Sequence, residues 1–272
     1  MSPPTSRIAE RFAELKRRGE VALIPYLTAG DPDLETTAQA LLALDASGAD
    51  LIELGIPYSD PLADGPVIQA AATRALGRGT TLEAILAMLS RIGSRMTAPV
   101  VLFTYYNPVL ALGVERFLDR ARAAGASGLV VPDLPLEEGE FLQAAARERN
   151  LDVIWLVAPT SPPERAVRIA AAASGFVYLV STTGVTGVRA RLAEGVRDSL
   201  ARLRGLTELP LAVGFGIGTP EQARQVAEWG ADGVVVGSAL VKLLAETPAP
   251  DRIAVLAGRC ASLKEALRIH PN

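Results

Sequence analysis

The sequence predicts an α/β fold, a (β/α)8 TIM barrel with an additional N-terminal helix. Short apolar runs rich in β-branched residues alternate with longer segments of helical spacing, which is the pattern of repeated βα units around a parallel sheet. The chain has eight such runs, and eight βα units are the number that closes a barrel. No linker-like composition interrupts them, so we expect residues 1–272 to form a single domain.

The expected strands are spaced so that at least one helix fits between each pair. They are Val21–Leu27, Asp50–Leu54, Val100–Phe103, Leu129–Val131, Val153–Val157, Phe176–Val180, Leu211–Val213 and Gly233–Val236. The expected helices are 34–47, 80–95, 114–124, 137–148, 162–173, 191–204, 219–229, 239–246 and 251–267. Before the first strand, Ile8, Phe12 and Leu15 share one face of an amphipathic helix, which we expect to lie as a lid on the core.

A Gly-Ala repeat supports these boundaries. It occurs in Ser47–Asp50, Ala124–Ser127 and Trp229–Asp232, where a helix should end and a strand begin. Glycine adopts the left-handed conformation at helix C-termini at little cost. The alternative architecture is an open, doubly wound sheet, which usually has a glycine fingerprint in its first βα turn. This chain has Thr28–Pro32 there, so we favour the barrel.

Composition and charge exclude several classes of protein. The chain is 49% hydrophobic and 21% charged, with a net charge of −3 spread along its length, so it gives no basic footprint for nucleic acid or anionic lipid. One cysteine and one histidine leave no disulfide framework and no His/Cys metal cluster. Because it lacks a signal-peptide core and a membrane-spanning stretch, we expect a cytoplasmic protein with no membrane partner.

Carboxylates near the second strand are the first candidates for chemistry, because a barrel holds its active site at the C-terminal ends of the strands. Glu53 interrupts a run of Leu and Ile, so it is desolvated whether it points toward the helices or into the barrel mouth, and its pKa should rise. A paired structural carboxylate is the alternative. Asp64 ends a Pro-rich loop that is too rigid for a simple connector, whereas Asp60 is equally well a turn or cap residue.

The last two βα turns predict an anion site. Strand seven runs into Gly214–Pro220, and strand eight runs into Gly237 and Ser238 at a helix start. Glycines let backbone N–H groups approach a ligand, and barrels often bind phosphate after strands seven and eight. Either motif alone would indicate only a tight turn, but the two together favour a phosphate-binding site. The polar loop Ser181–Arg191 is expected to close as a lid and to offer the N–H of Gly187, although a plain surface loop is the alternative.

Apolar and aromatic residues near the strand ends predict a pocket for an apolar phosphate ester. They are Tyr26, Phe103, Tyr105, Phe215 and Ile217. Tyr178 either adds a phenol to this pocket or belongs to the core. The lysines at 16, 242 and 264 lie outside the strand runs, which argues against Schiff-base or pyridoxal phosphate chemistry in this chain. Because histidines for a metal are lacking as well, general acid–base chemistry by carboxylates remains.

Four motifs resemble the α subunit of tryptophan synthase, and the resemblance extends over about residues 7–267. They are Ile24–Pro32, Glu53–Pro66, Tyr106-Asn107-Pro108 and Gly184–Gly187. The long acidic loop is the most specific of them. The resemblance implies a retro-aldol cleavage of indole-3-glycerol phosphate to indole and glyceraldehyde 3-phosphate.

Roles for individual residues follow from the same resemblance. It implies that Glu53 protonates indole C3 and takes the proton from the hydroxyl next to the breaking bond. Asp64 would hold the indole N–H and stabilise the positive indolenine, in agreement with two carboxylates in different environments. Tyr178 matches an active-site tyrosine, and Thr186 would bond Asp64 when the loops close. The implied phosphate site comprises Gly187, Gly216, Gly237 and Ser238.

The resemblance also implies a partner. No cofactor is expected in this chain, and indole would pass to a pyridoxal-phosphate β subunit through a tunnel in an αββα heterotetramer. Tyr105–Leu110 supports a contact surface at a barrel-face loop, although this loop could equally fold onto its own barrel. The alternatives are a stand-alone lyase that releases indole, a mainly regulatory binding subunit, and an unrelated phosphate-binding isomerase. The presence of both Glu53 and Asp64 argues against a regulatory subunit without chemistry.

Overall fold

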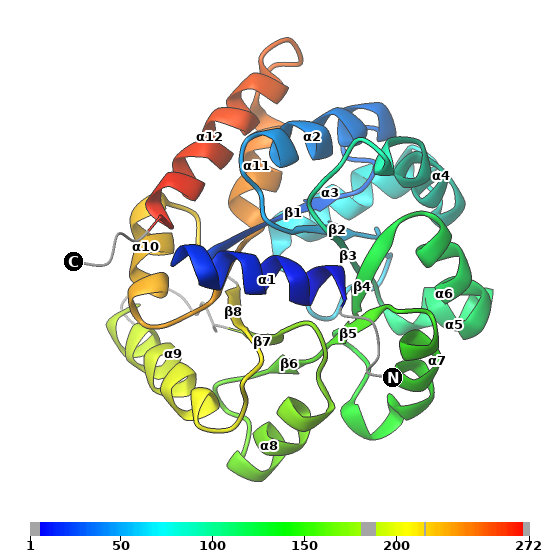
Figure 1. Cartoon of the computed structure of the whole chain (residues 1–272). Coiled ribbons are helices and arrows are strands. Elements are labelled where there is room, and N and C mark those ends of the chain that lie inside the picture. Colours follow the sequence, from blue (N-terminus) through cyan, green and yellow to red (C-terminus); the bar gives the residue numbers. More distant parts are fainter. Residues whose placement is uncertain (1–5, 181–188, 215, 269–272) are drawn as a thin grey trace.

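The structure, a computed structural model, describes residues 6–180, 189–214 and 216–268. Within these residues nine parallel strands form one sheet, in the order β5-β4-β3-β2-β1-β9-β8-β7-β6. The strands at the two ends of this order, β5 and β6, are consecutive in the chain and separated only by Trp155. The sheet therefore curls into a nearly closed barrel, and the predicted fold class is confirmed (Figure 1).

The strands are short and lie close to the predicted runs. Their bounds are Ala22–Thr28 (β1), Ile52–Gly55 (β2), Val100–Phe103 (β3), Ala126–Val130 (β4), Asp152–Ile154 (β5), Leu156–Val157 (β6), Val177–Val180 (β7), Leu211–Gly214 (β8) and Gly233–Val236 (β9). The predicted fifth run is split because its first half pairs with β4 and its second half with β7. This change of partner is the point at which the barrel closes.

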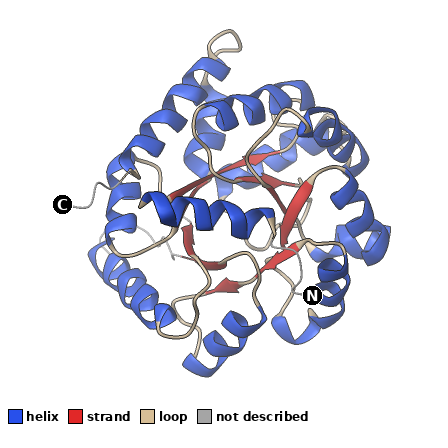
Figure 2. Cartoon of the chain, in the orientation of Figure 1, coloured by secondary structure: helices blue, strands red, loops and turns tan. Residues whose placement is uncertain are grey.

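Helices surround the barrel on its outside, apart from α1, which lies across one end (Figure 2). Their bounds are Arg7–Arg18 (α1), Leu34–Ala46 (α2), Pro66–Gly77 (α3), Leu82–Gly93 (α4), Tyr106–Leu112 (α5), Val114–Ala123 (α6), Glu140–Glu148 (α7), Pro163–Ala172 (α8), Arg189–Arg204 (α9), Pro220–Glu228 (α10), Ser238–Glu246 (α11) and Arg252–Ala266 (α12), with a 3-10 turn at Leu136–Glu138 (η1). At the helix-to-strand junctions the repeat glycines Gly48, Gly125 and Gly230 have φ of 97°, 94° and 94°, which is the conformation expected for them.

Two of these helices, α3 and α5, were not predicted. The segment Tyr105–Leu110 was expected to be a loop, and this was wrong, because most of it forms α5. In both helices the prolines that suggested a loop lie in the first turn. Pro66 is the first residue of α3 and Pro108 the third of α5, where a missing N–H leaves no helical hydrogen bond unmade.

Strand side chains alternate between two cores. Ile24 and Tyr26 of β1 point into the barrel, where they share a cluster with Phe103 of β3. Leu23 and Leu27 of the same strand belong instead to the larger cluster between strands and helices. Inward-facing positions near the strand C-termini therefore surround the barrel mouth.

Helix α1 crosses the opposite, N-terminal end of the barrel (Figure 1). Its Ile8, Phe12 and Leu15 are buried, as predicted for an amphipathic lid. The Phe12 ring lies 5.6 Å from the ring of Phe176 inside the barrel. This end is thus filled with apolar side chains.

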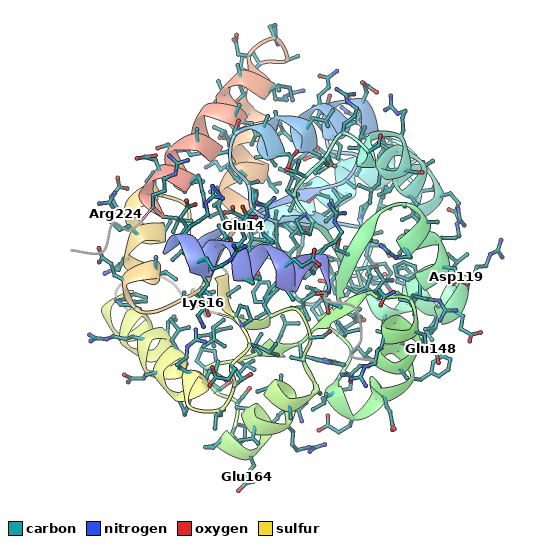
Figure 3. All side chains as sticks on the ribbon, viewed as in Figure 1. Glu14, Lys16, Asp119, Glu148, Glu164 and Arg224 are labelled. Carbon is teal, nitrogen blue, oxygen red and sulfur yellow. The ribbon has the colours of Figure 1, made fainter. Side chains whose placement is uncertain are left out.

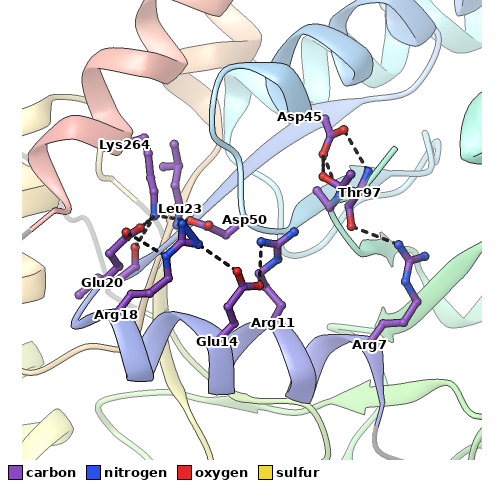
Figure 4. Close-up of polar contacts among 12 residues, drawn as sticks. Arg7, Arg11, Glu14, Arg18, Glu20, Leu23, Asp45, Asp50, Thr97 and Lys264 are labelled. Atoms are coloured by element: carbon purple, nitrogen blue, oxygen red, sulfur yellow. Dashed lines mark hydrogen bonds and ion pairs between the residues drawn. The ribbon is translucent and has the colours of Figure 1, made fainter. Parts of the chain in front are cut away.

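A buried ion cluster ties α12 to the same end (Figure 4). Lys264 Nζ lies 2.9 Å from Glu20 Oε2 and 2.9 Å from Asp50 Oδ2. Asp50 also accepts the backbone N–H of Leu23 at 2.8 Å. Burial raises the pKa of Asp50, and the charge of Lys264 opposes that rise. This lysine therefore has a structural partner far from the strand C-termini, as expected from its place outside the strand runs.

The outer surface of the helices carries most of the charge. Asp119, Glu148, Glu164 and Arg224 are exposed and point away from the barrel (Figure 3). Among the described residues, no helix combines the length and the apolar character needed to cross a bilayer.

Candidate active site

A pocket of about 210 Å³ opens at the C-terminal ends of the strands, away from α1. Most of the site residues predicted from the sequence line it. They are Tyr26, Glu53, Asp64, Phe103, Tyr178, Gly216, Gly237 and Ser238. They come from six strands or from the loops and helix that follow them, so the barrel brings together residues that are far apart in the chain.

Glu53 lies on β2, where it pairs in register with Tyr26 of β1 and Val101 of β3. All three side chains face the barrel interior, and Glu53 is only 2% exposed. Burial, and to a smaller extent the charge of Asp64, raises the pKa of Glu53 to about 8. Of the two orientations left open by the sequence, the one into the barrel mouth is therefore correct, and Glu53 is a protonated acid near pH 7.

Asp64 reaches the same pocket from the loop between β2 and α3. Its backbone C=O accepts a 2.8 Å hydrogen bond from Gln69 Nε2 in the first turns of α3. Partial burial raises the pKa of Asp64 to about 6, and a hydrogen bond from the Tyr105 hydroxyl opposes that rise. Near pH 7 this carboxylate is ionised while Glu53 keeps its proton, so the two acids are suited to different tasks.

Two tyrosines lie beside the carboxylates, each above a glycine of the next strand. A Cβ on Gly55 would collide with the Tyr26 hydroxyl, and one on Gly214 would collide with the Tyr178 hydroxyl. Glycine is needed at both positions because only it leaves room for these rings. Burial raises the pKa of both tyrosines, and the neighbouring carboxylates add to the effect, so both phenols stay neutral.

One wall of the pocket is apolar. The rings of Tyr26 and Phe103 meet edge to face, with centroids 5.8 Å apart and planes at 88°. Val67 and Ile68 of α3 and Val235 of β9 complete this wall. A flat apolar group fits such a surface.

Another part of the lining is suited to an anion. Gly237 precedes α11 and Ser238 is its first residue, and both line the pocket. The first N–H groups of a helix lack partners within it and carry the positive end of its dipole. Gly216, with φ of 75°, lines the pocket as well. Three residues of the predicted phosphate site thus line one pocket, and their role in binding phosphate stays a prediction.

Some predicted residues are not placed in the pocket. Thr186, Gly187 and Phe215 lie outside the described residues. Ile217 was expected to line the pocket but is buried in the core between strands and helices, because it faces outward. Tyr105 contacts Asp64 and its loop instead of lining the cavity. Asp60 is exposed and pairs with Ser59, as a turn residue would.

Sequence reasoning missed the contribution of α3. Val67 and Ile68 follow Pro66 directly, and recognising proline as a helix start would have signalled them. The hydrogen bond from the Ala63 N–H to the Tyr105 hydroxyl has no comparable signal in the sequence, because it joins residues about forty positions apart. Within the described residues, no group of three or more His, Cys, Asp or Glu side chains could hold a metal ion.

A family model described as tryptophan synthase alpha chain matches residues 12–267. The chain belongs to the tryptophan synthase alpha chain family. The alpha chain of Gloeobacter violaceus is 63% identical over 97% of this chain and 96% of its own length. That of a Picosynechococcus species is 58% identical over 96% of this chain and 98% of its own. The function expected from the sequence, an alpha chain and hence a lyase of tryptophan biosynthesis, is confirmed.

Solved structures of the family have the same fold. Tryptophan synthase subunit alpha from Legionella pneumophila aligns with a TM-score of 0.90 at 37% identity, covering 97% of this chain and 99% of that one. A chain of tryptophan synthase from Mycobacterium tuberculosis aligns with a TM-score of 0.89 at 39% identity, covering 98% of this chain and 100% of that one.

Proposed function

We propose that this chain cleaves indole-3-glycerol phosphate to indole and D-glyceraldehyde 3-phosphate, with Glu53 as proton carrier and Asp64 as electrostatic stabiliser. One observation carries the proposal. A buried acid with a pKa of about 8 and a carboxylate with a pKa of about 6 share a small pocket with the start of a helix. Near pH 7 the pair therefore offers one proton and one negative charge.

Glu53 acts first as a general acid and protonates indole C3. The ring becomes an indolenine with its positive charge centred on the nitrogen. Asp64 accepts the hydrogen bond of that N–H and stabilises the charge as it develops, which is the kind of interaction that lowers a barrier. Two neutral acids could not supply the negative charge, and two ionised carboxylates could not supply the proton.

Glu53, now ionised, then takes the proton from the hydroxyl on the carbon next to C3 of the indole. That oxygen forms the aldehyde C=O, the carbon–carbon bond breaks, and its electron pair restores the aromatic indole. Glu53 has given one proton and received one, so it ends in its starting state. Burial favours this cycle because the neutral form of the acid is restored.

Gly216, Gly237 and Ser238 hold the phosphate in this proposal, and the apolar wall with Tyr26 and Phe103, together with Tyr178, holds the indole. The start of helix α11 and the apolar wall line the same pocket, which supports this assignment. Thr186, Gly187 and Phe215 are assigned to the same binding site from the resemblance.

For the whole protein, we infer one domain of residues 1–272, without a cofactor of its own, that acts in the cytoplasm with a pyridoxal-phosphate β subunit. An αββα heterotetramer would deliver indole directly to that partner. Exposed apolar side chains near the pocket support a contact there, since Leu62 is 89% and Leu110 53% exposed. The Leu62 loop is tied to the α5 region by the hydrogen bond from Asn107 Nδ2 to the Tyr58 hydroxyl, 3.1 Å long.

The test is an indole-release assay with indole-3-glycerol phosphate, run with and without a β subunit. A general acid contributes roughly 10²–10⁴-fold to kcat. Glu53→Gln should lower kcat by at least this factor, because Glu53 serves two steps of the reaction. Asp64→Asn should lower kcat while KM changes little, since its charge matters most in the transition state. Asp60→Asn is the matched control, in the same loop but outside the pocket.

Wild-type turnover by Glu53→Gln would refute the assigned proton carrier. A raised KM with unchanged kcat in Asp64→Asn would make Asp64 a binding or capping residue. Equal kcat values with and without the β subunit would favour the second candidate function, a stand-alone lyase that releases free indole.

A further inference from the structure

We propose that the hydroxyl of Tyr26 binds the substrate directly, by donating a hydrogen bond to the glycerol hydroxyl that the cleavage leaves intact. The inference rests on the proposed function and deepens it. Tyr26 becomes a specificity-determining residue, which selects for a hydroxylated chain between the indole and the phosphate, in addition to its place in the apolar wall.

The side chain of Tyr26 extends from the anion site toward the strand of Glu53. A Cβ on Gly237 would lie 3.5 Å from Tyr26 Cβ and 3.6 Å from Cδ1, so the start of α11 is beside the base of the tyrosine. The other end of the ring lies over β2, where a Cβ on Gly55 would collide with the Tyr26 hydroxyl. Gly55 follows Glu53 by two residues, so both positions face the barrel interior. A ligand that joins the anion site to Glu53 therefore runs along Tyr26.

The hydroxyl of Tyr26 has a hydrogen-bonding capacity that the described part of the chain does not use. Tyr26 lines the pocket and is only 5% exposed, and its hydroxyl forms no hydrogen bond with a described residue. Burial raises the pKa of Tyr26, and Thr28, two residues further along β1, opposes that rise, but Thr28 Oγ1 has no hydrogen-bond partner either. Because an unpaired polar group in a desolvated place is costly, a phenol in this condition beside a pocket indicates that a ligand completes its hydrogen bonding.

The substrate has one polar group that the proposed function leaves without a partner. The phosphate binds at the start of α11, the indole N–H binds Asp64, and Glu53 takes the proton of the hydroxyl next to the ring. The remaining group is the middle hydroxyl of the three-carbon chain. In a pocket of about 210 Å³ this hydroxyl loses its water and needs a protein partner. Because the chain runs along Tyr26, the phenol is the group that meets it.

The phenol acts as the donor in this contact. Burial keeps Tyr26 neutral, so its oxygen carries one proton that it can give to the ligand. The second phenol of the pocket, Tyr178, lies over Gly214 of β8, whereas Tyr26 lies over the strand that carries Glu53. This placement favours Tyr26 as the partner of the chain next to the acid.

The experiment compares Tyr26→Phe with the wild-type chain on two ligands. One is indole-3-glycerol phosphate. The other is indole-3-propanol phosphate, which has the same ring, chain length and phosphate but no hydroxyl on its chain. Indole release gives kcat and KM for the first ligand, and calorimetry gives the Kd of the second.

The two ligands should respond differently. In Tyr26→Phe the KM for indole-3-glycerol phosphate should rise about fivefold, the size of one neutral hydrogen bond. The kcat should change little, because the middle hydroxyl does not react and is bound alike in the ground state and the transition state. The Kd of indole-3-propanol phosphate should stay within about twofold of the wild-type value, because this ligand has no hydroxyl to lose a partner.

Two other variants make the comparison specific. Tyr106→Phe is the matched control, because it removes a phenol hydroxyl from α5, outside the pocket, and should change neither constant. Tyr178→Phe removes the second phenol of the pocket. An unchanged KM in Tyr26→Phe, or an equal weakening of both ligands, would overturn the inference. A selective loss of the hydroxylated ligand in Tyr178→Phe but not in Tyr26→Phe would overturn it as well.

A failure of the proposed function gives a different result. If the wild-type chain releases no indole, or Glu53→Gln releases it at the wild-type rate, the proposed function falls and this inference falls with it. If the wild-type chain releases indole and Glu53→Gln does not, but Tyr26→Phe fails to distinguish the two ligands, only the role of the Tyr26 hydroxyl falls.

Discussion

Replacing Glu53 by Gln should stabilise the fold, and increasingly so as the pH rises. In the folded protein the pKa of Glu53 is about 8, whereas its ordinary value is 4.5. The unfolded chain therefore releases this proton first, and the wild-type protein loses stability as the pH rises from 4.5 toward 8. Gln has the same shape and does not titrate, so the variant escapes this loss.

The size of the effect follows from the two pKa values. At pH 7 the unfolded carboxyl is almost fully ionised and the folded one almost fully protonated, which costs about 3 kcal/mol of unfolding free energy. At pH 5 the same calculation gives less than about 1 kcal/mol. The gain of Glu53→Gln over wild type should thus grow by about 2.5 kcal/mol between pH 5 and pH 7.

Urea unfolding followed by circular dichroism at several pH values measures this difference. The matched control is Glu164→Gln, which changes an exposed side chain on α8 (Figure 3) and should leave the pH dependence as in wild type. A stability difference between Glu53→Gln and wild type that is the same from pH 5 to pH 8 would refute the reasoning. Glu53 would then titrate alike in both states and would not be a protonated acid at pH 7.

Two further predictions concern catalysis and binding. The kcat for indole release should peak near pH 7. The state with Asp64 ionised and Glu53 protonated makes up about 0.8 of the molecules at pH 7 but only about 0.1 at pH 5 or pH 9. A kcat that rises steadily from pH 7 to pH 9 at saturating substrate would contradict the assigned order of proton transfers. Gly237→Leu should weaken the binding of indole-3-glycerol phosphate but not of an unphosphorylated indole analogue, measured by calorimetry, because it blocks approach to the start of α11. Gly237→Ala is the control, because a Cβ at this position lies 3.5 Å from Tyr26 Cβ, an ordinary contact distance. An equal loss of affinity for both ligands in Gly237→Leu would indicate general damage to the pocket.

The sequence alone determined the barrel and the identity of its main carboxylates. Repeated βα spacing is local, and a parallel sheet buried on both faces leaves a continuous apolar run at each strand. Glu53 stands out because it interrupts such a run, and Asp64 because its loop is rich in proline. Chain order then placed Gly237 and Ser238 at the position where barrels hold phosphate. All four residues line the pocket.

Only the tertiary structure decided which way these residues face and which protons they hold. A carboxylate in an apolar strand is desolvated on either face, and the register with Tyr26 and Val101 put Glu53 inside the barrel. The separation of the two pKa values depends on burial and on contacts such as that between Tyr105 and Asp64, which join distant parts of the chain. Local spacing carries no record of such contacts, because they exist only once the barrel has closed.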